Sequence, residues 1–367
     1  IDKKNEFILV FNGEIYNYIE LRKLLIDDGY EFITNSDTEV LLNSYINWGT
    51  KLFQKIKGMF SFAIYDIKKK QILCARDHFG QKPFFYYFKD GNFIFSSELT
   101  SLISNPIIKR NIDIKSIENY LHYDSFVGET TPISNCYKLL PSEFLIFNIT
   151  ERSIQKEKYW NLNYSNKKNE HENNYKEFID KLILSTKLHL RSDVPIGLYL
   201  SGGVDSASLA SIAKKEFNYD VATFSIIDPD ERYNELENIQ ATINDLDCKH
   251  FLVHLNFENM LERLEDLVTY HDSPVSTISY LIHSMLSEKI SECGYRVAVS
   301  GTSADELFTG YYDHFNLHLY EMRNHSKFEQ YLKDWQDHTG NFVTNPYLKN
   351  PKLYFKDQSI RAHTHLD

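Results

Sequence analysis

Residues 196–206 read Ile-Gly-Leu-Tyr-Leu-Ser-Gly-Gly-Val-Asp-Ser, and the fold of the second half of the chain follows from them. The first five are apolar enough to form a central, buried strand. The segment after them places apolar residues at helical spacing: Leu209, Ile212, Ala213 and Phe217. Two glycines between a strand and a helix let the backbone turn sharply and bring N–H groups to a ligand at the positive end of the helix. This stretch therefore predicts a phosphate-binding loop.

The side chains of this loop suit a nucleotide that carries a metal ion. Ser201 and Ser206 offer hydroxyl donors to phosphate oxygens, whereas Asp205 would repel phosphate unless Mg²⁺ lies between them. The alternative is a plain strand–helix connection with Asp205 or Ser206 as the helix cap. The coincidence of Ser-Gly-Gly, an aspartate and this setting favours phosphate binding. Neither a Walker loop nor a dinucleotide fingerprint is present.

A second polar motif follows the predicted strand at residues 296–299. Residues 300–312 read Ser-Gly-Thr-Ser-Ala-Asp-Glu-Leu-Phe-Thr-Gly-Tyr-Tyr. The first loop resembles that of the PP-loop ATP pyrophosphatases, in which the first and fourth strands are adjacent. Because ligands of parallel sheets bind where the strand order reverses, the resemblance implies that this motif faces the first loop. Asp205 and Asp305 could then share one Mg²⁺ ion. The alternative is that Asp305 and Glu306 only begin a surface helix.

Both motifs resemble those of a known family. The first loop is similar to that of the PP-loop ATP pyrophosphatases, and the second resembles the Ser-Gly-acid-Gly-x-Asp-Glu-x-Phe-x-Gly-Tyr signature of asparagine synthetases. The resemblance implies a metal at Asp205 and Asp305, and catalytic roles for both and for Glu306. It implies ATP binding by Leu200, Ser201, Gly202, Gly203, Asp205, Ser206, Ile226, Ser300 and Gly301.

Two features of this resemblance leave alternatives open. Leu200 and Ile226 occupy the positions beside adenine, but either could equally be plain core. Thr302 stands where the family has an acid, and Ser303 where it has glycine. The missing carboxylate bears on metal binding, on proton handling and on specificity for aspartate.

The first half of the chain carries a different set of motifs. Asn12-Gly13-Glu14-Ile15-Tyr16-Asn17 resembles a block of the class II glutamine amidotransferases, although Asn-Gly alone more often marks a turn. Further matches follow in order at residues 36–39, 58–66 and 76–84. The resemblance implies that the Asn12 amide and the Gly13 N–H stabilise an oxyanion, and that Glu14 and Asp37 complete the glutamine site. The pair Arg76 and Asp77 reads as structural.

The glutamine nucleophile of that family is a cysteine at the mature N-terminus, whose own α-amino group acts as base. Here residue 1 is isoleucine, and Cys74 lies inside a predicted strand. Relatives also place a catalytic lysine in the C-terminal part, beyond residue 367. We therefore expect a family member truncated at both ends, and we predict that residues 1–367 do not hydrolyse glutamine.

The hydrophobic rhythm predicts two domains. Residues 1–160 read as layered α+β with antiparallel sheets, similar to Ntn hydrolases: strands 6–11, 59–66, 71–76, 84–88 and 93–97, helices 18–27 and 38–48. Residues 161–174 are polar and predict a linker. Residues 175–367 read as α/β with a parallel, Rossmann-like sheet: strands 196–200, 221–227, 249–255 and 296–299, helices 175–191, 206–217, 234–246, 258–270 and 278–292.

The net charge, the apolar runs and the cysteines of the chain limit which classes of partner are expected. The net charge of −11 gives no support to a nucleic-acid partner. No apolar run is long enough to cross a bilayer, so no membrane is expected. Four scattered cysteines predict neither a disulfide framework nor a zinc site and point to the cytoplasm. A homodimer stays open.

The resemblance implies a glutamine-hydrolysing asparagine synthetase that uses ATP, Mg²⁺, L-glutamine and L-aspartate. An aspartyl-adenylate would form with release of pyrophosphate, and ammonia would displace AMP. Asp272, Pro274, Ser276 and Ser279 loosely match the stretch that contacts aspartate. One alternative is amidation of a different carboxylate, in surface-sugar or secondary-metabolite biosynthesis. Another is a non-catalytic ATP- or metabolite-binding paralogue.

Overall fold

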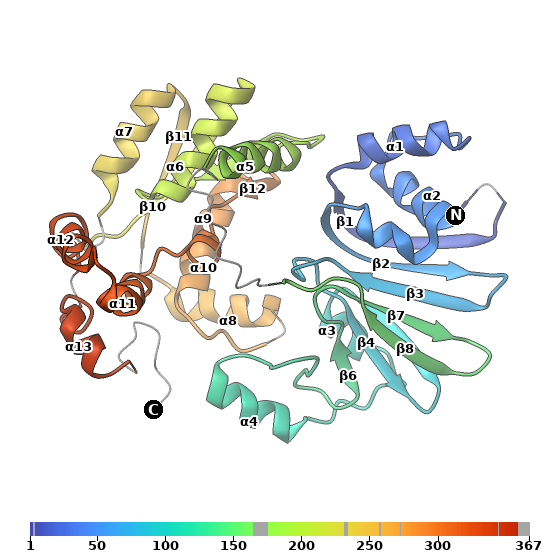
Figure 1. Cartoon of the computed structure of the whole chain (residues 1–367). Coiled ribbons are helices and arrows are strands. Elements are labelled where there is room, and N and C mark those ends of the chain that lie inside the picture. Colours follow the sequence, from blue (N-terminus) through green and yellow to red (C-terminus); the bar gives the residue numbers. More distant parts are fainter. Residues whose placement is uncertain are drawn as a thin grey trace. The chain divides into compact units, whose positions relative to one another are not determined.

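The computed structural model describes residues 1–2, 4–163, 175–230, 234–256, 258–271, 273–343 and 345–358. The described chain forms two compact units (Figure 1). Unit 1 comprises residues 1–195 and 253–294, and unit 2 comprises residues 196–252 and 295–367. The predicted linker lies mostly at residues 164–174, outside the described residues, so the predicted domain boundary stays a prediction.

A five-stranded antiparallel sheet organises the described part of unit 1, in the order β1-β2-β3-β7-β8. Its strands are β1 (Phe7–Ile15), β2 (Gly58–Asp66), β3 (Gln71–Arg76), β7 (Glu143–Asn148) and β8 (Ser153–Lys158). A smaller antiparallel sheet has the order β5-β4-β6, with β4 (Phe85–Lys89), β5 (Asn92–Ser96) and β6 (Cys136–Lys138). The strands predicted at residues 59–66, 71–76, 84–88 and 93–97 are confirmed within one residue, and they pair as two hairpins.

Alternation along the strands explains why unit 1 is layered. Phe62 and Ile64 on β2 face one core, which they share with α1 (Tyr18–Asp27) and α2 (Asp37–Trp48). Ala63 between them faces the second core, which lies against the smaller sheet and includes Cys74 and Tyr86. On the far side of that sheet, α3 (Leu99–Ile103) packs through Leu99. The predicted layered α+β fold is thus confirmed.

Strand β1 is longer than the sequence predicted. The prediction ended it at residue 11 and placed the Asn12-Gly13-Glu14 block after it. In the structure the ladder with β2 continues through Asn12↔Ser61, Gly13↔Phe60 and Glu14↔Met59. Cross-strand pairing with β2 overrides the turn preference of Asn-Gly, which is a local signal only. That boundary was therefore wrong, and the block lies in a strand.

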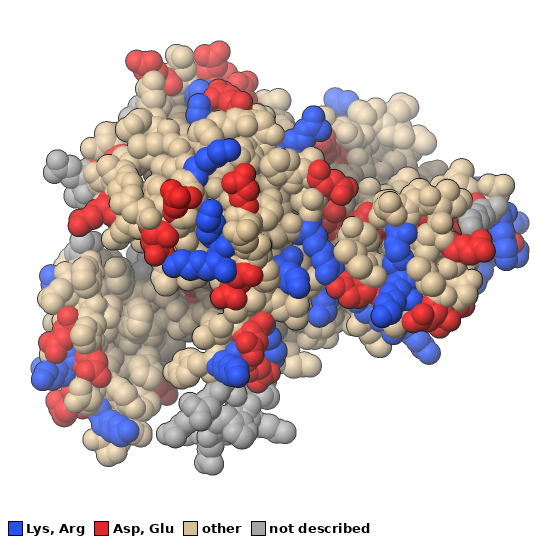
Figure 2. Space-filling model, turned by 90° about the horizontal axis from the view of Figure 1, so that it is seen from above, with Lys and Arg blue, Asp and Glu red and all other residues tan. Residues whose placement is uncertain are grey.

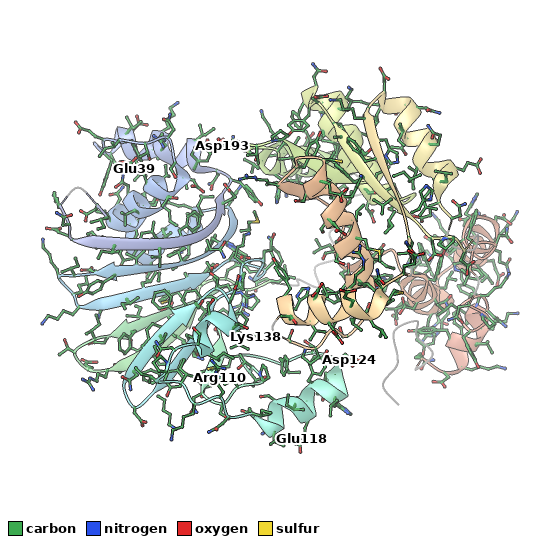
Figure 3. All side chains as sticks on the ribbon, turned by 180° about the vertical axis from the view of Figure 1, so that it is seen from behind. Glu39, Arg110, Glu118, Asp124, Lys138 and Asp193 are labelled. Carbon is green, nitrogen blue, oxygen red and sulfur yellow. The ribbon has the colours of Figure 1, made fainter. Side chains whose placement is uncertain are left out.

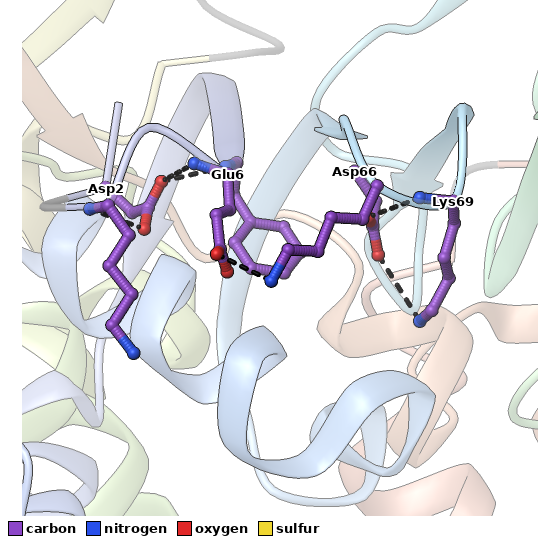
Figure 4. Close-up of polar contacts among 7 residues, drawn as sticks. Asp2, Glu6, Asp66 and Lys69 are labelled. Atoms are coloured by element: carbon purple, nitrogen blue, oxygen red, sulfur yellow. Dashed lines mark hydrogen bonds and ion pairs between the residues drawn. The ribbon is translucent and has the colours of Figure 1, made fainter.

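Polar contacts hold the backbone just before β1 and at the turn between β2 and β3 (Figure 4). The Asp2 carboxylate accepts the N–H groups of Glu6 and Phe7 at 2.7 and 2.8 Å. At the β2–β3 turn, Asp66 is buried and accepts the N–H of Lys69 at 3.0 Å. These contacts satisfy backbone donors that the ladder leaves unpaired at its ends.

The residues Arg76 and Asp77 are structural, as the sequence favoured. Asp77 is fully buried and accepts backbone N–H groups from the turn that follows it and from β2: Phe60, Phe79, Gln81 and Lys82, at 2.9–3.2 Å. Arg76 donates to the carbonyls of Gly80, Lys82 and Leu139 at 2.7–2.8 Å. Together they hold the turn between β3 and β4 without any ligand.

Unit 2 is built on a sheet with the order β11-β10-β9-β12. Its strands are β9 (Ile196–Tyr199), β10 (Ala222–Ile227), β11 (Lys249–His254) and β12 (Val297–Val299). β9 lies between β10 and β12 and is parallel to both, so the predicted parallel sheet is confirmed. The first and fourth strands are adjacent, and the strand order therefore reverses at β9.

The helices of the second half follow the predicted alternation. They are α5 (Tyr175–His189), α6 (Val204–Ser211), α7 (Leu236–Leu246), α8 (Met260–His271) and α9 (Ser279–Glu292). A short π-helical turn, Ile212–Glu216, continues α6. Of these, α5, α8 and α9 belong to unit 1, although the sequence grouped them with the nucleotide-binding half.

Several elements were not predicted. In unit 1 these include α4 (Ile114–Tyr123) and the strands β6, β7 and β8. In unit 2 they are α10 (Ala304–Phe308), α11 (Tyr312–Glu321), α12 (Phe328–His338) and α13 (Pro351–Lys356). Leu319, Trp335, Val343 and Leu348 form a small core among the last three.

Surface charge and helix length bear on possible partners. On the face seen from above, Lys and Arg are interspersed with Asp and Glu rather than gathered into one basic field (Figure 2). Among the described helices, none is both long and apolar enough to cross a membrane.

Candidate active site

The loop at residues 201–206 is held in place by its own side chains. The Ser206 hydroxyl is buried and accepts the Ser201 N–H at 3.0 Å. The two hydroxyls, of Ser201 and Ser206, lie 3.0 Å apart, and Ser201 Oγ accepts the Gly203 N–H at 3.2 Å. The loop leads directly into α6, whose first turn carries Asp205. These hydrogen bonds within the loop restrict its conformation, which lowers the entropy cost of binding.

An acidic side chain from α7 closes the same loop. Glu235 immediately precedes α7, and its carboxylate accepts the Gly202 N–H at 3.0 Å. A Cβ added at Gly202 would lie 2.6 Å from the Cβ of Glu235 and 3.2 Å from that of Asn238. The loop backbone therefore packs directly on the start of α7, and only glycine fits at this position.

The second motif lies beside the first loop, as expected from the order of strands. The parallel pairs Val297↔Ile196 and Val299↔Leu198 bring the carboxyl ends of β12 and β9 to the same edge. A Cβ added at Gly301 would lie 3.0 Å from both Asp205 Cβ and the Ser206 N atom. The two loops are therefore in van der Waals contact at a glycine, at the topological switch point of the sheet.

Asp205 and Asp305 form an acidic pair at this contact. Burial and the negative charge of Asp305 raise the pKa of Asp205 above its ordinary value. Two carboxylates that repel each other are the residue types that a divalent cation with oxygen ligands neutralises. In the described residues no cluster of three or more His, Cys, Asp or Glu side chains forms a metal cage by itself. Any Mg²⁺ bound here would need further ligands from nucleotide and water.

The Asp305→Asn variant tests this pairing. Removing the charge of Asp305 should lower the pKa of Asp205 toward its ordinary value, because one of its two causes disappears. Carbon-13 NMR titration of the Asp205 carboxyl should then show its midpoint at a lower pH than in the unsubstituted chain. Asp220→Asn, at an exposed site of the same unit, should leave that midpoint unmoved. An unchanged midpoint in Asp305→Asn would contradict the pairing.

Glu306 and Gly310 shape the second motif. The Tyr311 hydroxyl donates to Glu306 Oε1 at 2.6 Å, and this bond is the main reason why the pKa of Tyr311 is raised to about 12. A Cβ at Gly310 would overlap the Asp305 carboxylate. Glycine at 310 therefore leaves the space in which the Asp305 carboxylate sits.

The second motif departs from the family signature at Thr302 and Ser303, and its backbone is strained at Ser303 and Thr309. The hydroxyls of Thr302 and Ser300 are 2.7 Å apart, so a neutral pair stands where the signature has an acid. Ser303 has φ +74° and Thr309 has φ +62°. Left-handed backbone is costly for a β-branched residue such as threonine. Residues 303–309 therefore carry conformational strain at both ends of α10.

The Thr309→Gly variant should relieve part of this strain. We expect the free energy of unfolding to rise by about 1 kcal/mol, because glycine has no Cβ to clash at positive φ. Thr339→Gly is the matched control. Thr339 has φ −120°, where glycine gains nothing and loses entropy, so that variant should be slightly destabilised. Urea denaturation of the two variants should give changes of opposite sign, and a shared sign would rule out strain at Thr309.

The two candidate adenine neighbours differ in exposure. Leu200 is only 2% exposed and takes part in the strand pairing, because its N–H donates to the Phe224 carbonyl at 2.9 Å. Ile226, near the end of β10, keeps part of its surface accessible. Of the two, Ile226 has the side chain that a ligand can contact without displacing the core.

The predicted glutamine residues come together in unit 1. Asn12 and Glu14 share one face of β1, and the Asn12 amide donates to Ser97 Oγ at 3.2 Å. Asp37 begins α2 after the cap Ser36, and it accepts the Ile15 N–H at 2.9 Å. Burial raises the pKa of Glu14, and the charges of Asp37 and Asp193 raise it further. An ammonium group would relieve this repulsion.

Two further residues, Asp193 and Arg191, interact with this part of the chain and were not identified from the sequence. Asp193, labelled in Figure 3, precedes β9 and adds its charge to Glu14 from a distant part of the chain. Arg191 binds the Tyr16 carbonyl and Glu20 Oε2, both at 2.7 Å. No local pattern marks either residue.

Glu39, which is also labelled in Figure 3, orders the loop before α2 by accepting the Ile33 and Thr34 N–H groups.

Cys74 cannot serve as a nucleophile in this conformation. It is fully buried in β3 between two packed layers, and burial raises the pKa of its thiol well above the ordinary value. Nucleophilic attack needs the thiolate, so an inert, packed thiol is the result.

Part of the stretch matched loosely to aspartate binding lines a cavity. Pro274 and Ser276 border a space of about 450 Å³ in unit 1, together with Tyr120, Lys138 and Tyr280. Asp272 lies outside the described residues. Ser279 begins α9. Nothing in the geometry ties this cavity to one ligand.

Comparison with known sequences covers both halves of the chain. The profile of a family described as a glutamine amidotransferase domain matches residues 1–160, and that of a family described as asparagine synthase matches residues 177–364. The profiles thus match, in order, the two segments that carry the two sets of motifs.

Individual relatives agree with the profiles. The chain is 33% identical to a putative glutamine-hydrolyzing asparagine synthetase 2 of Methanocaldococcus jannaschii, over 85% of this chain and 60% of the relative. It is 34% identical to asparagine synthetase 1 of Bacillus subtilis, over 83% and 47%. Amidase chyE of Penicillium rubens is 27% identical, over 89% and 50%. The chain thus spans about half the length of such relatives. A solved glutamine phosphoribosylpyrophosphate amidotransferase of B. subtilis is 12% identical over 77% of this chain and 74% of its own, with a TM-score of 0.33.

Proposed function

Because the chain belongs to the asparagine synthase family, we propose that the whole protein is a glutamine-dependent asparagine synthetase that consumes ATP. The observation that carries the proposal is the meeting of two loops at the switch point of the sheet, where Gly301 touches Asp205 and Ser206. A nucleotide bound there would have its phosphates between the start of α6 and the second motif.

The proposed nucleotide site divides into three parts. Ser201, Gly202, Gly203 and Ser206 would hold phosphate, with Ser300 and Gly301 opposite them, and Ile226 would lie nearer the adenine, beside the buried Leu200. Asp205 and Asp305 would hold Mg²⁺, which supplies positive charge to offset the phosphates and the pyrophosphate that leaves. The mutual repulsion of the two carboxylates fits them for a cation.

The proposed reaction joins two half-reactions. The aspartate side-chain carboxylate attacks the α-phosphorus of ATP, the bond to pyrophosphate breaks, and an aspartyl-adenylate forms. Ammonia then attacks the acyl carbon, AMP leaves and asparagine forms. Glu306 is close enough in sequence to Asp305 to act on this chemistry, with its carboxylate oriented by Tyr311.

The glutamine half would supply the ammonia. Asn12 and the Gly13 N–H would stabilise the oxyanion, while Glu14 and Asp37 would bind the glutamine ammonium. Burial raises the pKa of Glu14, and the charges of Asp37 and Asp193 raise it further, so a bound ammonium would relieve the repulsion among these carboxylates. We do not expect glutamine hydrolysis from residues 1–367 alone, because Cys74 is buried and its thiol stays protonated.

One observation favours a second acceptor. Thr302 and Ser300 present a neutral hydroxyl pair where the family signature has an acid. A relative named as an amidase also matches the chain. Amidation of a carboxylate other than that of aspartate is therefore the second candidate function, on the same ATP chemistry.

Pyrophosphate release by the whole protein separates these candidates. The assay contains Mg·ATP and ammonium, with and without L-aspartate. Release that depends on aspartate, with asparagine formed, supports the proposal. Bound ATP without any aspartate dependence favours a different acceptor. Failure to bind Mg·ATP in calorimetry leaves the non-catalytic paralogue as the better account.

A further inference from the structure

Three backbone N–H groups of the loop at residues 201–206 donate hydrogen bonds to side chains. The Ser201 and Gly203 N–H groups donate to hydroxyls of the loop itself. The Gly202 N–H differs, because its acceptor is the Glu235 carboxylate, which is charged and belongs to another segment. An anion thus already occupies one of the loop's donors.

Glu235 occupies the N-cap position of α7 but does not cap that helix with its side chain. It is the residue before the first turn of α7, where a short polar side chain usually caps the helix. Its side chain makes no capping hydrogen bond to α7 and reaches the loop instead. The backbone contact between Gly202 and the start of α7 keeps the carboxylate within reach of the loop.

We propose that the Glu235 carboxylate holds the place of a phosphate oxygen on the loop, and that a nucleoside triphosphate must displace it to bind. This inference rests on the proposed ATP site. The like charge of Glu235 also opposes phosphate directly, in addition to that of Asp205 and Asp305. Glu235 is exposed, so its carboxylate can rotate into water without leaving a cavity. Glu235 thus sets the affinity and the phosphate dependence of the site.

Calorimetry on the 367-residue chain tests this role. Binding of Mg·ATP and of adenosine is compared in the unsubstituted chain, in Glu235→Gln and in Glu237→Gln. Glutamine keeps the length and an acceptor oxygen but removes the charge. Glu237 lies in the first turn of the same helix and is equally exposed, which makes it a matched control. We expect Glu235→Gln to tighten Mg·ATP by about three- to tenfold, and adenosine to bind as before.

The other outcomes overturn the inference in distinct ways. Weaker Mg·ATP binding in Glu235→Gln would make the carboxylate a ligand of the metal, and unchanged binding would make it a structural clamp. An equal gain for adenosine would place the effect away from the phosphates. An equal gain in Mg·ATP affinity in Glu237→Gln would show that the effect comes from long-range charge and not from the contact with Gly202. If the unsubstituted chain bound neither compound, the proposed ATP site itself would fail, which is a different result from failure of the Glu235 role alone.

Discussion

Pyrophosphate release by the whole protein should fall about a hundred- to a thousandfold when Asp205 is replaced by asparagine. The reason is electrostatic. Asp205 lies at the contact of the two loops, where burial and the charge of Asp305 both raise its pKa. Asparagine keeps the shape of the side chain but leaves a single carboxylate to hold a metal between the protein and the phosphates.

Direct binding distinguishes a metal ligand from a residue that only shapes the loop. In Asp205→Asn, Mg·ATP should bind more weakly, whereas metal-free ATP should bind no worse, since one repulsive charge has gone. Asp220→Asn, at an exposed position of the same unit, should change neither affinity. If Asp205→Asn weakened both forms of ATP alike, the role of Asp205 would be structural.

The two loops of the candidate nucleotide site were predictable because their signals are local. A strand, two glycines and a helix at residues 196–217 specify the first loop, and the order of strands brings residues 300–301 beside it. Glu235 carried no such signal. Its role depends on the packing of α7 against Gly202, which is a tertiary contact between segments 33 residues apart. The strain at Thr309 could not be predicted either, because the residue type does not specify the backbone angle φ.

In the candidate glutamine site, by contrast, local sequence signals gave the wrong secondary structure. Asn12-Gly13 has the composition of a turn, yet both residues lie in β1 because β2 supplies a continuous ladder for them. The helices after residue 303 escaped prediction for a related reason. Their core consists of scattered residues such as Leu319 and Trp335, which come together only when the helices pack.

Gly13→Ala should strongly destabilise unit 1. Gly13 has φ +149°, and a Cβ there would lie 2.7 Å from Phe60 Cα and would overlap the Met59 carbonyl oxygen. Both obstacles are backbone atoms of the paired strand and cannot rotate away. We expect the free energy of unfolding to fall by about 3 kcal/mol or more, measured by chemical denaturation.

The matched control is Gly29→Ala. Gly29 also has a positive φ, +91°, but a Cβ there meets nothing within 4 Å. That variant should lose only about 1 kcal/mol, the cost of left-handed backbone alone. Equal losses in the two variants would show that β1 and β2 can separate locally. A larger loss at Gly13 would mean that the ladder is rigid where it carries Asn12 and Glu14, and that the β1–β2 pairing itself holds the proposed glutamine site in shape.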